Sequence, residues 1–499
     1  MSVMRLSGLA SGIDTESMIK NMMKVQRMKV DKFSQNKQLM QWRQEQYNSV
    51  NKDFANFVLD IRKEMELTKS TLSGVSYKNS MSNLSWVKKA TSSNDSIFTA
   101  SATTAAPGGI HTLKVHNLAE GVSVASQDRV EAAKGMSTTL AELGFTEDSG
   151  TIDFEVDGKT ITVNYEKGDT ISKFISNINN ASKKEGDKTI SLGLQASFDA
   201  ASGRFFLSTK GTGEQAQIKI TADDKGILTG ENNLFKLKAI TGKDMDGNPI
   251  YGPLAVVNTN EEGLKGKNAV ISYNGAENIE YASNQFTING IQINLKAMPA
   301  SASDTFTIKV DTDVDGVYDK IKTFVDKYNE LIDKMNGTIS EKRYRSYLPL
   351  TSEQRESLSE KEIELWEEKA KSGLLAGDQT INRTLLNMRN SLYDEVKGDG
   401  ISSKYNYLFN IGITTGDFKS KGKLEIDETK LKAAIADDVD GVLNLFFKEY
   451  TVEDGDSGRP EAEMKKKAKA GMGLFNRLVD DIVVGMKEMI DKSGTGTNA

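Results

Sequence analysis

The residue pattern that looks most like a chemical site is an acidic segment at residues 311–316. It places Asp311, Asp313, Asp315 and Gly316 at the first, third, fifth and sixth positions of an EF-hand calcium loop. The twelfth position of such a loop is a glutamate that binds calcium with two oxygens, but here it is Lys322. We therefore interpret the segment as a strand end followed by an acid-rich helix start, which the helix dipole favours.

Other side chains suited to catalysis or metal binding are scarce. The chain of 499 residues has no cysteine and only two histidines, His111 and His116. Without cysteine there is no disulfide, zinc–thiolate site or thiol nucleophile. The two histidines are five residues apart on a predicted strand, so they face opposite sides and cannot share a metal. We expect no catalytic residue, no cofactor and no metal site, and an enzyme is the least favoured class of function.

Charge and hydropathy limit the classes of partner. The net charge is −6, which argues against nucleic acid as the main partner. No stretch approaches the roughly 18 apolar residues of a membrane-spanning helix. The first 90 residues carry 15 lysines and arginines against eight acidic residues, but such an excess more often marks a solvated helix face. The N-terminus lacks the continuous apolar stretch of a cleavable secretory signal, so export needs another route.

The elements that would position functional residues follow from the spacing of apolar side chains. Residues 19–72 contain no proline or glycine, and apolar residues recur there at helical spacing: Met40, Tyr47, Val50, Phe54, Phe57 and Ile61. This pattern predicts a helix of roughly 80 Å with a coiled-coil or bundle seam. A second apolar stripe at residues 475–490 predicts an amphipathic helix near the C-terminus. Because neither helix can bury its apolar face alone, we expect each to need a partner.

Between the two ends, residues 92–310 alternate apolar and polar side chains in a stretch rich in threonine, serine, glycine and asparagine. The dipeptides at 157–158 (Asp-Gly) and 289–290 (Asn-Gly) each separate two alternating runs, which predicts β-hairpins. The apolar residues 205–207 are expected to pair with those at 218 and 220, and a short helix is predicted over 170–181. The sequence thus predicts an α+β multidomain protein, with helical terminal legs flanking two antiparallel β-rich domains and both termini at one pole.

Several motifs, in order along the chain, resemble those of one family. Residues 7–19 (SGLASGIDTESMI) resemble the N-terminal signature of flagellar filament cap proteins, also called the flagellar hook-associated protein 2 family. Residues 109–119 are similar to the strand-and-turn motif that follows in that family, and residues 168–208 resemble an insert shared by flagellins and cap proteins. The resemblance continues at the re-entry helix, residues 311–332, and at the C-terminal landmarks 374–378, 411–414 and 422–431.

The resemblance implies a cap at the distal end of the bacterial flagellum, which retains exported flagellin and promotes its folding and insertion. It implies secretion by the flagellar type III export route and an extracellular location at the flagellum tip. The implied partners are sister copies in a small ring (a pentamer by family), flagellin, hook–filament junction proteins and, before secretion, an export chaperone. Family members continue past Ala499 with a long terminal helix, so we expect that helix to be missing here.

These inferences predict a division into five segments. Residues 1–42 form an N-terminal export and docking segment, and 43–105 with 313–470 form the helical leg domain. Residues 106–127 with 240–312 form a β domain, 128–239 an outer β-rich domain, and 471–499 the C-terminal helix and tail. The residues expected to carry assembly and docking are apolar and lie in the terminal legs: Leu9, Ile13, Met18, Met22, Val50, Phe54, Phe57, Ile61, Leu478, Ile482 and Met486.

Two alternative functions stay open from the sequence. A flagellin-like or hook–filament junction subunit would share the helical ends and the β-rich middle, although the landmarks at 377–378 and 411–414 favour the cap. An extracellular adhesin would use the β domains to bind a host surface receptor such as a glycan or mucin, and this role is compatible with capping.

Overall fold

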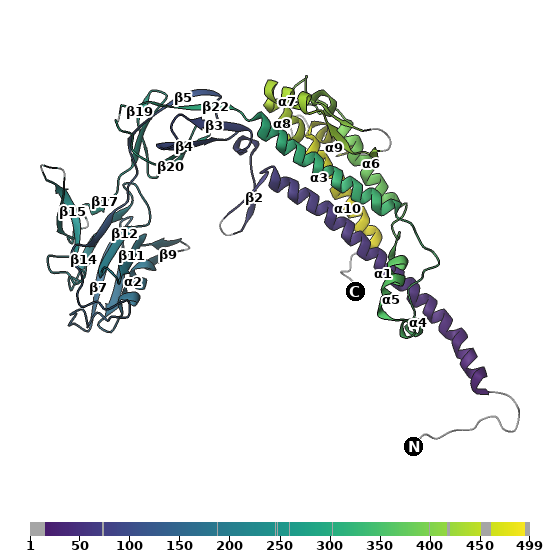
Figure 1. The fold of residues 1–499 in the computed structure, drawn as a ribbon, viewed down its shortest axis with the longest axis horizontal. Coiled ribbons are helices and arrows are strands. Elements are labelled where there is room, and N and C mark those ends of the chain that lie inside the picture. Colours follow the sequence, from purple (N-terminus) through teal and green to yellow (C-terminus); the bar gives the residue numbers. More distant parts are fainter. Residues whose placement is uncertain are drawn as a thin grey trace, which may run out of the picture. The chain divides into compact units, whose positions relative to one another are not determined.

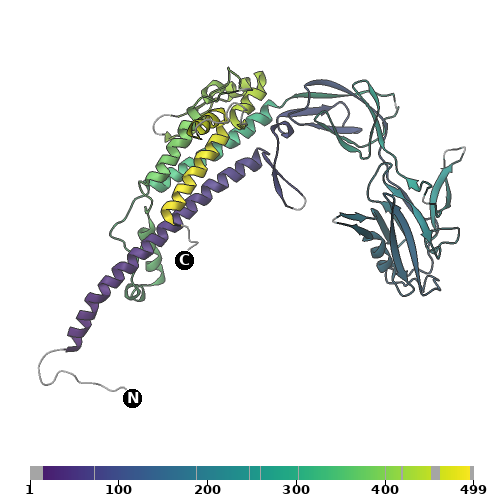
Figure 2. The same ribbon diagram turned by 180° about the vertical axis from the view of Figure 1, so that it is seen from behind.

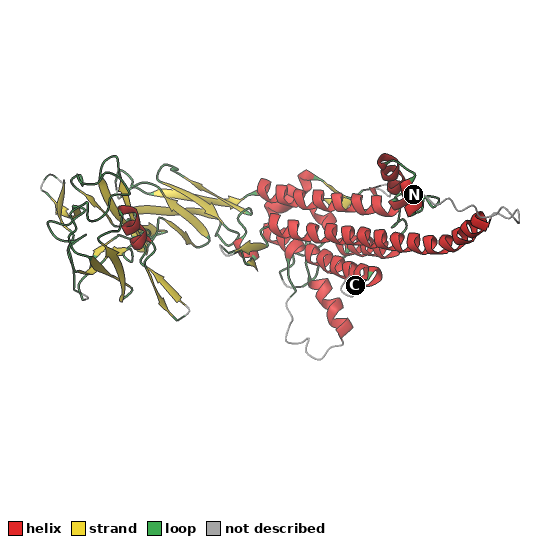
Figure 3. Cartoon of the chain, turned by 90° about the horizontal axis from the view of Figure 1, so that it is seen from below, coloured by secondary structure: helices red, strands yellow, loops and turns green. Residues whose placement is uncertain are grey.

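The structure is a computed structural model that describes residues 15–71, 74–186, 188–244, 246, 248–258, 260–301, 303–398, 400–416, 420–450 and 461–494. The chain divides into two compact units. The helical unit comprises residues 1–87 and 312–499, and the β unit comprises residues 88–311. Helices dominate the first unit and strands the second (Figure 3). The predicted α+β fold, in which helices from both ends of the chain flank antiparallel β domains, is confirmed.

Three long helices form the centre of the helical unit. α1 (Thr15–Glu64), α3 (Val314–Ser340) and α10 (Leu474–Ser493) lie side by side, and α6 (Gln379–Tyr393) packs against α10 (Figures 1 and 2). The shorter elements are α4 (Ser352–Glu356), α5 (Glu360–Lys371), α7 (Glu428–Asp437), α8 (Val439–Phe447), α9 (Glu461–Gly471), η1 (Met81–Asn83), η2 (Leu408–Ile411), and two hairpins, β1 (Thr68–Ser70) with β2 (Ser76–Lys78) and β23 (Ile413–Thr415) with β24 (Leu424–Ile426). The N-terminal half of α1 runs on past the ends of α3 and α10 (Figures 1 and 2).

One hydrophobic core joins these helices, and Phe324 of α3 lies within it. Its fully buried ring contacts Phe57 of α1, Phe446 of α8 and Phe475 of α10, with ring centroids 6.5, 5.5 and 6.4 Å apart. Burying a side chain of this size contributes roughly 1.5–3 kcal/mol. Because the four rings come from distant parts of the sequence, the core ties both ends of the chain together.

The acidic segment at 311–316 is a strand end and a helix start, as interpreted from the sequence. Asp311 lies in β22 (Phe306–Thr312) and pairs with a lysine of the same strand. The carboxylate of Asp313 caps α3 by accepting a hydrogen bond from the Gly316 amide at 3.0 Å, and Asp315 forms an ion pair with Lys432 at 2.8 Å. The three carboxylates thus have separate partners. Within the described ranges, no group of three or more His, Cys, Asp or Glu side chains could hold a metal.

The β unit has two separate hydrophobic cores. The first lies within a five-stranded sheet of order β19–β18–β5–β22–β3 and a three-stranded sheet of order β20–β21–β4. Besides β22, its strands are β3 (Lys88–Ser92), β4 (Phe98–Ala102), β5 (Gly109–Asn117), β18 (Ala269–Tyr273), β19 (Ala276–Tyr281), β20 (Gln285–Ile288) and β21 (Ile291–Leu295). On β5, His111 is buried and stacks on Tyr273, whereas His116 bonds to Ser272, so the two histidines have separate surroundings.

The second core lies within a five-stranded sheet of order β11–β12–β6–β15–β16, a three-stranded sheet of order β14–β7–β8, and helix α2 (Ile171–Asn179). The strands of these two sheets are β6 (Ser123–Ser126), β7 (Ser149–Val156), β8 (Lys159–Glu166), β11 (Leu194–Asp199), β12 (Arg204–Thr209), β14 (Ile220–Asp223), β15 (Leu237–Lys243) and β16 (Pro249–Pro253). Two short strand pairs also belong to the unit: β9 (Ser182–Glu185) with β10 (Lys188–Ser191), and β13 (Gln217–Ile218) with β17 (Leu264–Lys265). All these pairings are antiparallel.

The predicted hairpin turns are confirmed. Asp157-Gly158 connects β7 to β8, and Asn289-Gly290 connects β20 to β21. All four residues have a positive φ, as a two-residue type I′ turn requires. The predicted short helix is α2, which begins after the capping side chain of Thr170.

Two other predictions differ from the structure. Residues 205–207 lie in β12, which pairs with β11 and β6, whereas residue 220 lies in β14, which pairs with β7. Short apolar runs specify a strand but not its partner, because packing in the folded sheet decides the pairing. The β unit begins at residue 88 rather than 106, since β3 and β4 belong to the sheets of its first core. The finer five-part division of the chain stays a prediction.

A buried arginine ties α10 to the ends of two other helices. Arg477 is 1% exposed. Its guanidinium donates hydrogen bonds to the carbonyls of Asp394 (2.9 Å) and Glu395 (2.7 Å), which follow α6, and to those of Ala470 (2.8 Å) and Met472 (2.9 Å) at the end of α9. The last turns of a helix leave carbonyls without partners inside the helix. One planar group with five N–H donors therefore satisfies carbonyls at two helix ends, although burial lowers the pKa of Arg477.

We expect Arg477→Met to lower the free energy of unfolding of the helical unit by about 3 kcal/mol or more, because buried carbonyls lose their donors. Urea titration followed by circular dichroism measures this change. Arg477→Lys should restore only part of the loss, since an ammonium group cannot reach carbonyls on both sides. The matched control is Arg383→Met on α6, whose side chain is 60% exposed. An equal loss for both methionine variants would contradict the role of Arg477.

Candidate assembly surface

One heptad seam runs along the whole of α1. Its positions alternate in steps of four and three: 19, 23, 26, 30, 33, 37, 40, 44, 47, 51, 54, 58 and 61, all apolar except 26, 37, 44 and 51. Such spacing keeps side chains on one slowly winding stripe of a helix. From Tyr47 onward the stripe lies in the core with α3 and α10, and Phe54 and Ile61 have no exposed surface. The C-terminal half of the seam is therefore filled within the subunit.

In the N-terminal half of α1 the same seam is uncovered. We call its apolar members the exposed seam: Ile19, Met23, Val30, Phe33 and Met40, which are 60, 56, 65, 74 and 72% exposed. Single exposed apolar residues are normal on a protein surface, but five on one face of a helix, interrupted only at Gln26 and Lys37, indicate an interaction site. The exposed seam is thus a surface that continues an interface already filled farther along the same helix.

The structure separates the predicted docking residues into three groups. Met18 and Met22 lie beside the exposed seam and are 56 and 68% exposed. The largest group lies in the subunit's own core, where Met486 is partly buried and the others fully buried: Val50, Phe54, Phe57, Ile61, Leu478, Ile482 and Met486. Leu9 and Ile13 lie outside the described residues.

The partners that both terminal helices were expected to need therefore lie within the subunit for most of their length. α10 packs against α1, α6 and α8, and α3 and α10 cover the C-terminal half of α1. Met40, which we expected in the packed seam, is exposed. Met23, Val30 and Phe33 were not predicted as docking residues, although the heptad spacing that runs through them was a usable signal. Periodicity shows which face of a helix is apolar, but not where its covering helices end.

A polar cluster marks the end of the covered part of α1. The Tyr47 hydroxyl donates a hydrogen bond to the Asp378 carboxylate at 2.5 Å, and Lys492, near the end of α10, forms an ion pair with the same carboxylate at 2.6 Å. Asp378 also caps α6 by accepting hydrogen bonds from the amides of Thr380 and Ile381. One carboxylate thus joins α1, α6 and α10.

The cluster shifts the acidity of its members. Burial alone would raise the pKa of Asp378, but the hydrogen bonds from Lys492 and Tyr47 outweigh it, and the pKa is lowered. Burial raises the pKa of Tyr47, and its hydrogen bond to Asp378 adds to the effect. Burial opposes the charged form of Lys492, yet the contact with Asp378 raises the pKa of that ammonium group. Near neutral pH the pair is therefore ionised and the tyrosine neutral.

A groove of about 1030 Å³ lies beside the exposed seam. Seven side chains of α1 form one wall: Met22, Met23, Gln26, Arg27, Lys29, Val30 and Asp31. Residues 351–353, at the start of α4, form the other wall. Walls of apolar side chains with charged groups between them suit a peptide or a helix.

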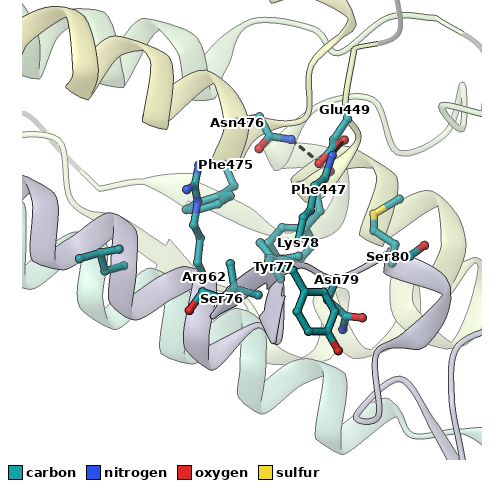
Figure 4. Close-up of a pocket in the computed structure, with 14 residues that line it drawn as sticks. Arg62, Ser76, Tyr77, Lys78, Asn79, Ser80, Phe447, Glu449, Phe475 and Asn476 are labelled. Carbon is teal, nitrogen blue, oxygen red and sulfur yellow. Dashed lines mark hydrogen bonds and ion pairs between the residues drawn. The ribbon is translucent and has the colours of Figure 1, made fainter. Parts of the chain in front are cut away.

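A second cavity, of about 880 Å³, lies at the C-terminal end of α1 (Figure 4). Its apolar lining includes Phe447 and Phe475, and its rim carries an ion pair between Lys78 and Glu449. The side-chain amide of Asn476 donates hydrogen bonds to the carbonyls of residues 447 and 448. Among the described residues that line the cavity there is no histidine, cysteine or aspartate, and the one carboxylate is paired. We find no acid–base constellation there.

These features define a class of protein: a structural subunit in which both ends of the chain build one helical unit, a β unit is inserted between them, and an apolar stripe extends along a projecting helix. Comparison with known families identifies one within this class. The model of the flagellar hook-associated protein 2 N-terminus matches residues 11–121, and that of its C-terminus matches residues 266–492, together more than half of the chain. The chain belongs to the flagellar hook-associated protein 2 family.

Relatives and solved structures agree with this assignment. The chain is 29% identical to the flagellar hook-associated protein 2 of Halalkalibacterium halodurans, over 98% of this chain and 88% of the relative. It is 28% identical to that of Thermotoga maritima, over 63% of this chain and 45% of the relative. The crystal structure of the D1, D2 and D3 domains of the Escherichia coli flagellar cap protein matches 90% of this chain and 99% of that one, with a TM-score of 0.52 and 20% identity. That likeness shows a shared fold. In the described part of the chain, no helix has the length and apolar character to cross a membrane.

We expect the attachment of α10 to α1 to weaken in acid. A carboxyl with a lowered folded pKa stabilises the fold above its unfolded pKa, and this contribution is lost as the pH falls through the folded value. For Asp378 the loss begins below about pH 4. Asp378→Asn keeps an oxygen for the α6 cap but removes the charge, so it should cost about 1–3 kcal/mol near neutral pH and reduce the acid sensitivity.

Thermal unfolding from neutral pH to about pH 3 measures this linkage. The control is Asp333→Asn, which removes an exposed partner of Lys423 and should change little. If wild type and Asp378→Asn lose stability equally as the pH falls, the cluster does not hold α10 in the way described.

Proposed function

We propose that this chain caps the distal end of the flagellar filament, where it retains exported flagellin and promotes its folding and insertion. The observation that carries the proposal is the family match at both ends of the chain, together with a fold shared with a flagellar cap protein over 90% of the chain. The role is structural rather than catalytic. The flagellin-like and adhesin alternatives gain no support from these relatives.

The proposal extends to place and partners. The chain works outside the cell at the flagellum tip, after secretion by the flagellar type III route. Its partners are sister copies in a ring, a pentamer by family resemblance, as well as flagellin and hook–filament junction proteins. An export chaperone binds it before secretion. The absence of cysteine is compatible with this path, because a chain that is exported unfolded gains nothing from thiols on the way.

Within this function we assign docking at the filament tip to the exposed seam. The assignment is supported by its continuity with the filled seam of the same helix and by its exposed apolar surface. Covering apolar surface contributes roughly 25 cal/mol per Å², so a stripe of a few side chains gives a modest contact. A modest contact suits a leg that has to release and dock again as each flagellin subunit enters.

A strain that lacks this protein tests the proposal when it is complemented with variants. We expect the deletion strain to build short filaments and spill flagellin into the medium, and the wild-type gene to reverse both defects. Phe33→Glu should fail to reverse them, because a charge on the exposed seam opposes its burial at the filament tip. Since Phe33 is 74% exposed, the variant should fold normally.

The matched control is Leu386→Glu, which places the same charge on a 58% exposed leucine of α6. A deletion strain with full-length filaments and no spilt flagellin would end the cap proposal. Full complementation by Phe33→Glu would instead remove the exposed seam from the docking surface and leave the cap proposal standing.

A further inference from the structure

The segment between α3 and α6 forms a closed loop beside the middle of α1 (Figure 1). We call residues 341–374 the collar; it contains α4 and α5. Its two ends are joined, because the Arg343 guanidinium donates hydrogen bonds to the carbonyls of Ala370 (2.6 Å) and Ser372 (3.0 Å). The amide of Gly373 also donates to the Glu341 carboxylate at 2.8 Å. The collar is thus held shut by contacts of its own.

The collar contacts α1 through a tryptophan between two glutamines. Trp42 is 5% exposed and packs with Ala370 and Leu374 in a small core separate from that of the bundle. The side-chain amide of Gln35 donates to the Pro349 carbonyl at 2.7 Å, and that of Gln46 donates to a carbonyl at the end of α5 at 2.9 Å. These contacts extend from the last covered turn of α1 into its uncovered half.

The collar packs on a face of α1 other than the exposed seam, although its residues 351–353 also line the groove beside that seam. Residues 35, 39, 42 and 46 follow one another at steps of four, three and four, so they form a stripe of their own. At about 100° per residue, this stripe points to roughly the opposite side of the helix from the exposed seam. The packing contacts of the collar therefore lie on the far side of α1, and the exposed seam, bordered by residues 351–353, stays open to solvent.

We propose that the collar, with Trp42 as its positioning residue, fixes the direction and the helical state of the N-terminal half of α1, so that the exposed seam is presented outward. A helix with one uncovered apolar face and no packing partner is marginal in water. Contacts at Gln35 and Trp42 extend the packed part of α1 beyond Tyr47, where the bundle core ends. What the exposed seam docks to rests on the proposed function, but the positioning does not.

Gly373 allows the collar to be opened without changing α1. Its φ is +64°, and a Cβ there would lie 2.8 Å from backbone atoms of residues 341–343. The opposing atoms are backbone and cannot move aside as a flexible side chain would. Gly373→Ala must therefore disturb the closure, whereas Trp42→Ala removes the contact on α1. The two variants, at different sites, thus test the same contact between the collar and α1.

Hydrogen exchange on the full chain, read by mass spectrometry, tests the proposal. In Trp42→Ala and in Gly373→Ala, backbone amides of residues 18–40 should exchange about tenfold faster or more, while peptides 54–61 and 317–332 of the bundle core keep their rates. Trp42→Phe should restore slow exchange. The control Met40→Ala, two residues from Trp42 but on the exposed seam, should exchange like wild type. Amides 18–40 of the double variant should exchange no faster than those of either single variant, because both substitutions break the same contact between the collar and α1.

Wild-type exchange rates at residues 18–40 in both variants would overturn the proposal. Equally faster exchange of the amides in the bundle core would also overturn it, because it would show that the substitutions destabilise the whole helical unit and not only the N-terminal half of α1. In the complementation assay, Trp42→Ala and Gly373→Ala should spill flagellin although every residue of the exposed seam is intact. If the deletion strain itself spills nothing, the cap function fails while the exchange result still decides the positioning role.

Discussion

The helical unit depends on one constraint: the apolar stripe of α1 is longer than the set of helices that covers it. The heptad spacing places apolar side chains on this stripe along most of the helix, yet α3 and α10 cover the stripe only from Tyr47 onward. The exposed seam is therefore the unfilled part of one continuous packing pattern, not a separate surface. Filling it elsewhere, in another molecule or at the filament tip, uses the same chemistry that forms the core.

Polar contacts hold both ends of α10 in place and so set how much of α1 this helix covers. Arg477 fixes the start of α10 to the ends of α6 and α9, and the contact of Asp378 with Lys492 fixes its end beside Tyr47. With both ends held, α10 cannot slide along α1 to cover more of the stripe. Beyond the end of the bundle, the collar packs on the other side of α1. The N-terminal half of α1 is thus supported while its apolar face stays open to solvent.

Local chemistry in the sequence was enough to predict several elements. The turns at 157–158 and 289–290, the short helix predicted over 170–181 and the acidic start of α3 each depend on a few neighbouring residues, and all were confirmed. The docking residues were harder, because Phe54 and Phe33 occupy equivalent seam positions and only the ends of α3 and α10 make one buried and the other exposed. The collar could not be predicted at all, since Trp42 meets Leu374 across more than 300 residues of sequence.

The measurement that tests this account most directly is the accessibility of the exposed seam before and after assembly. The chain has no cysteine, so Phe33→Cys introduces a single reactive thiol on the exposed seam. We predict fast maleimide labelling of the free chain and labelling about tenfold slower or more in caps on filament tips, while Lys184→Cys in β9 keeps one rate in both states. Equal labelling of position 33 in the free and assembled states would contradict the account.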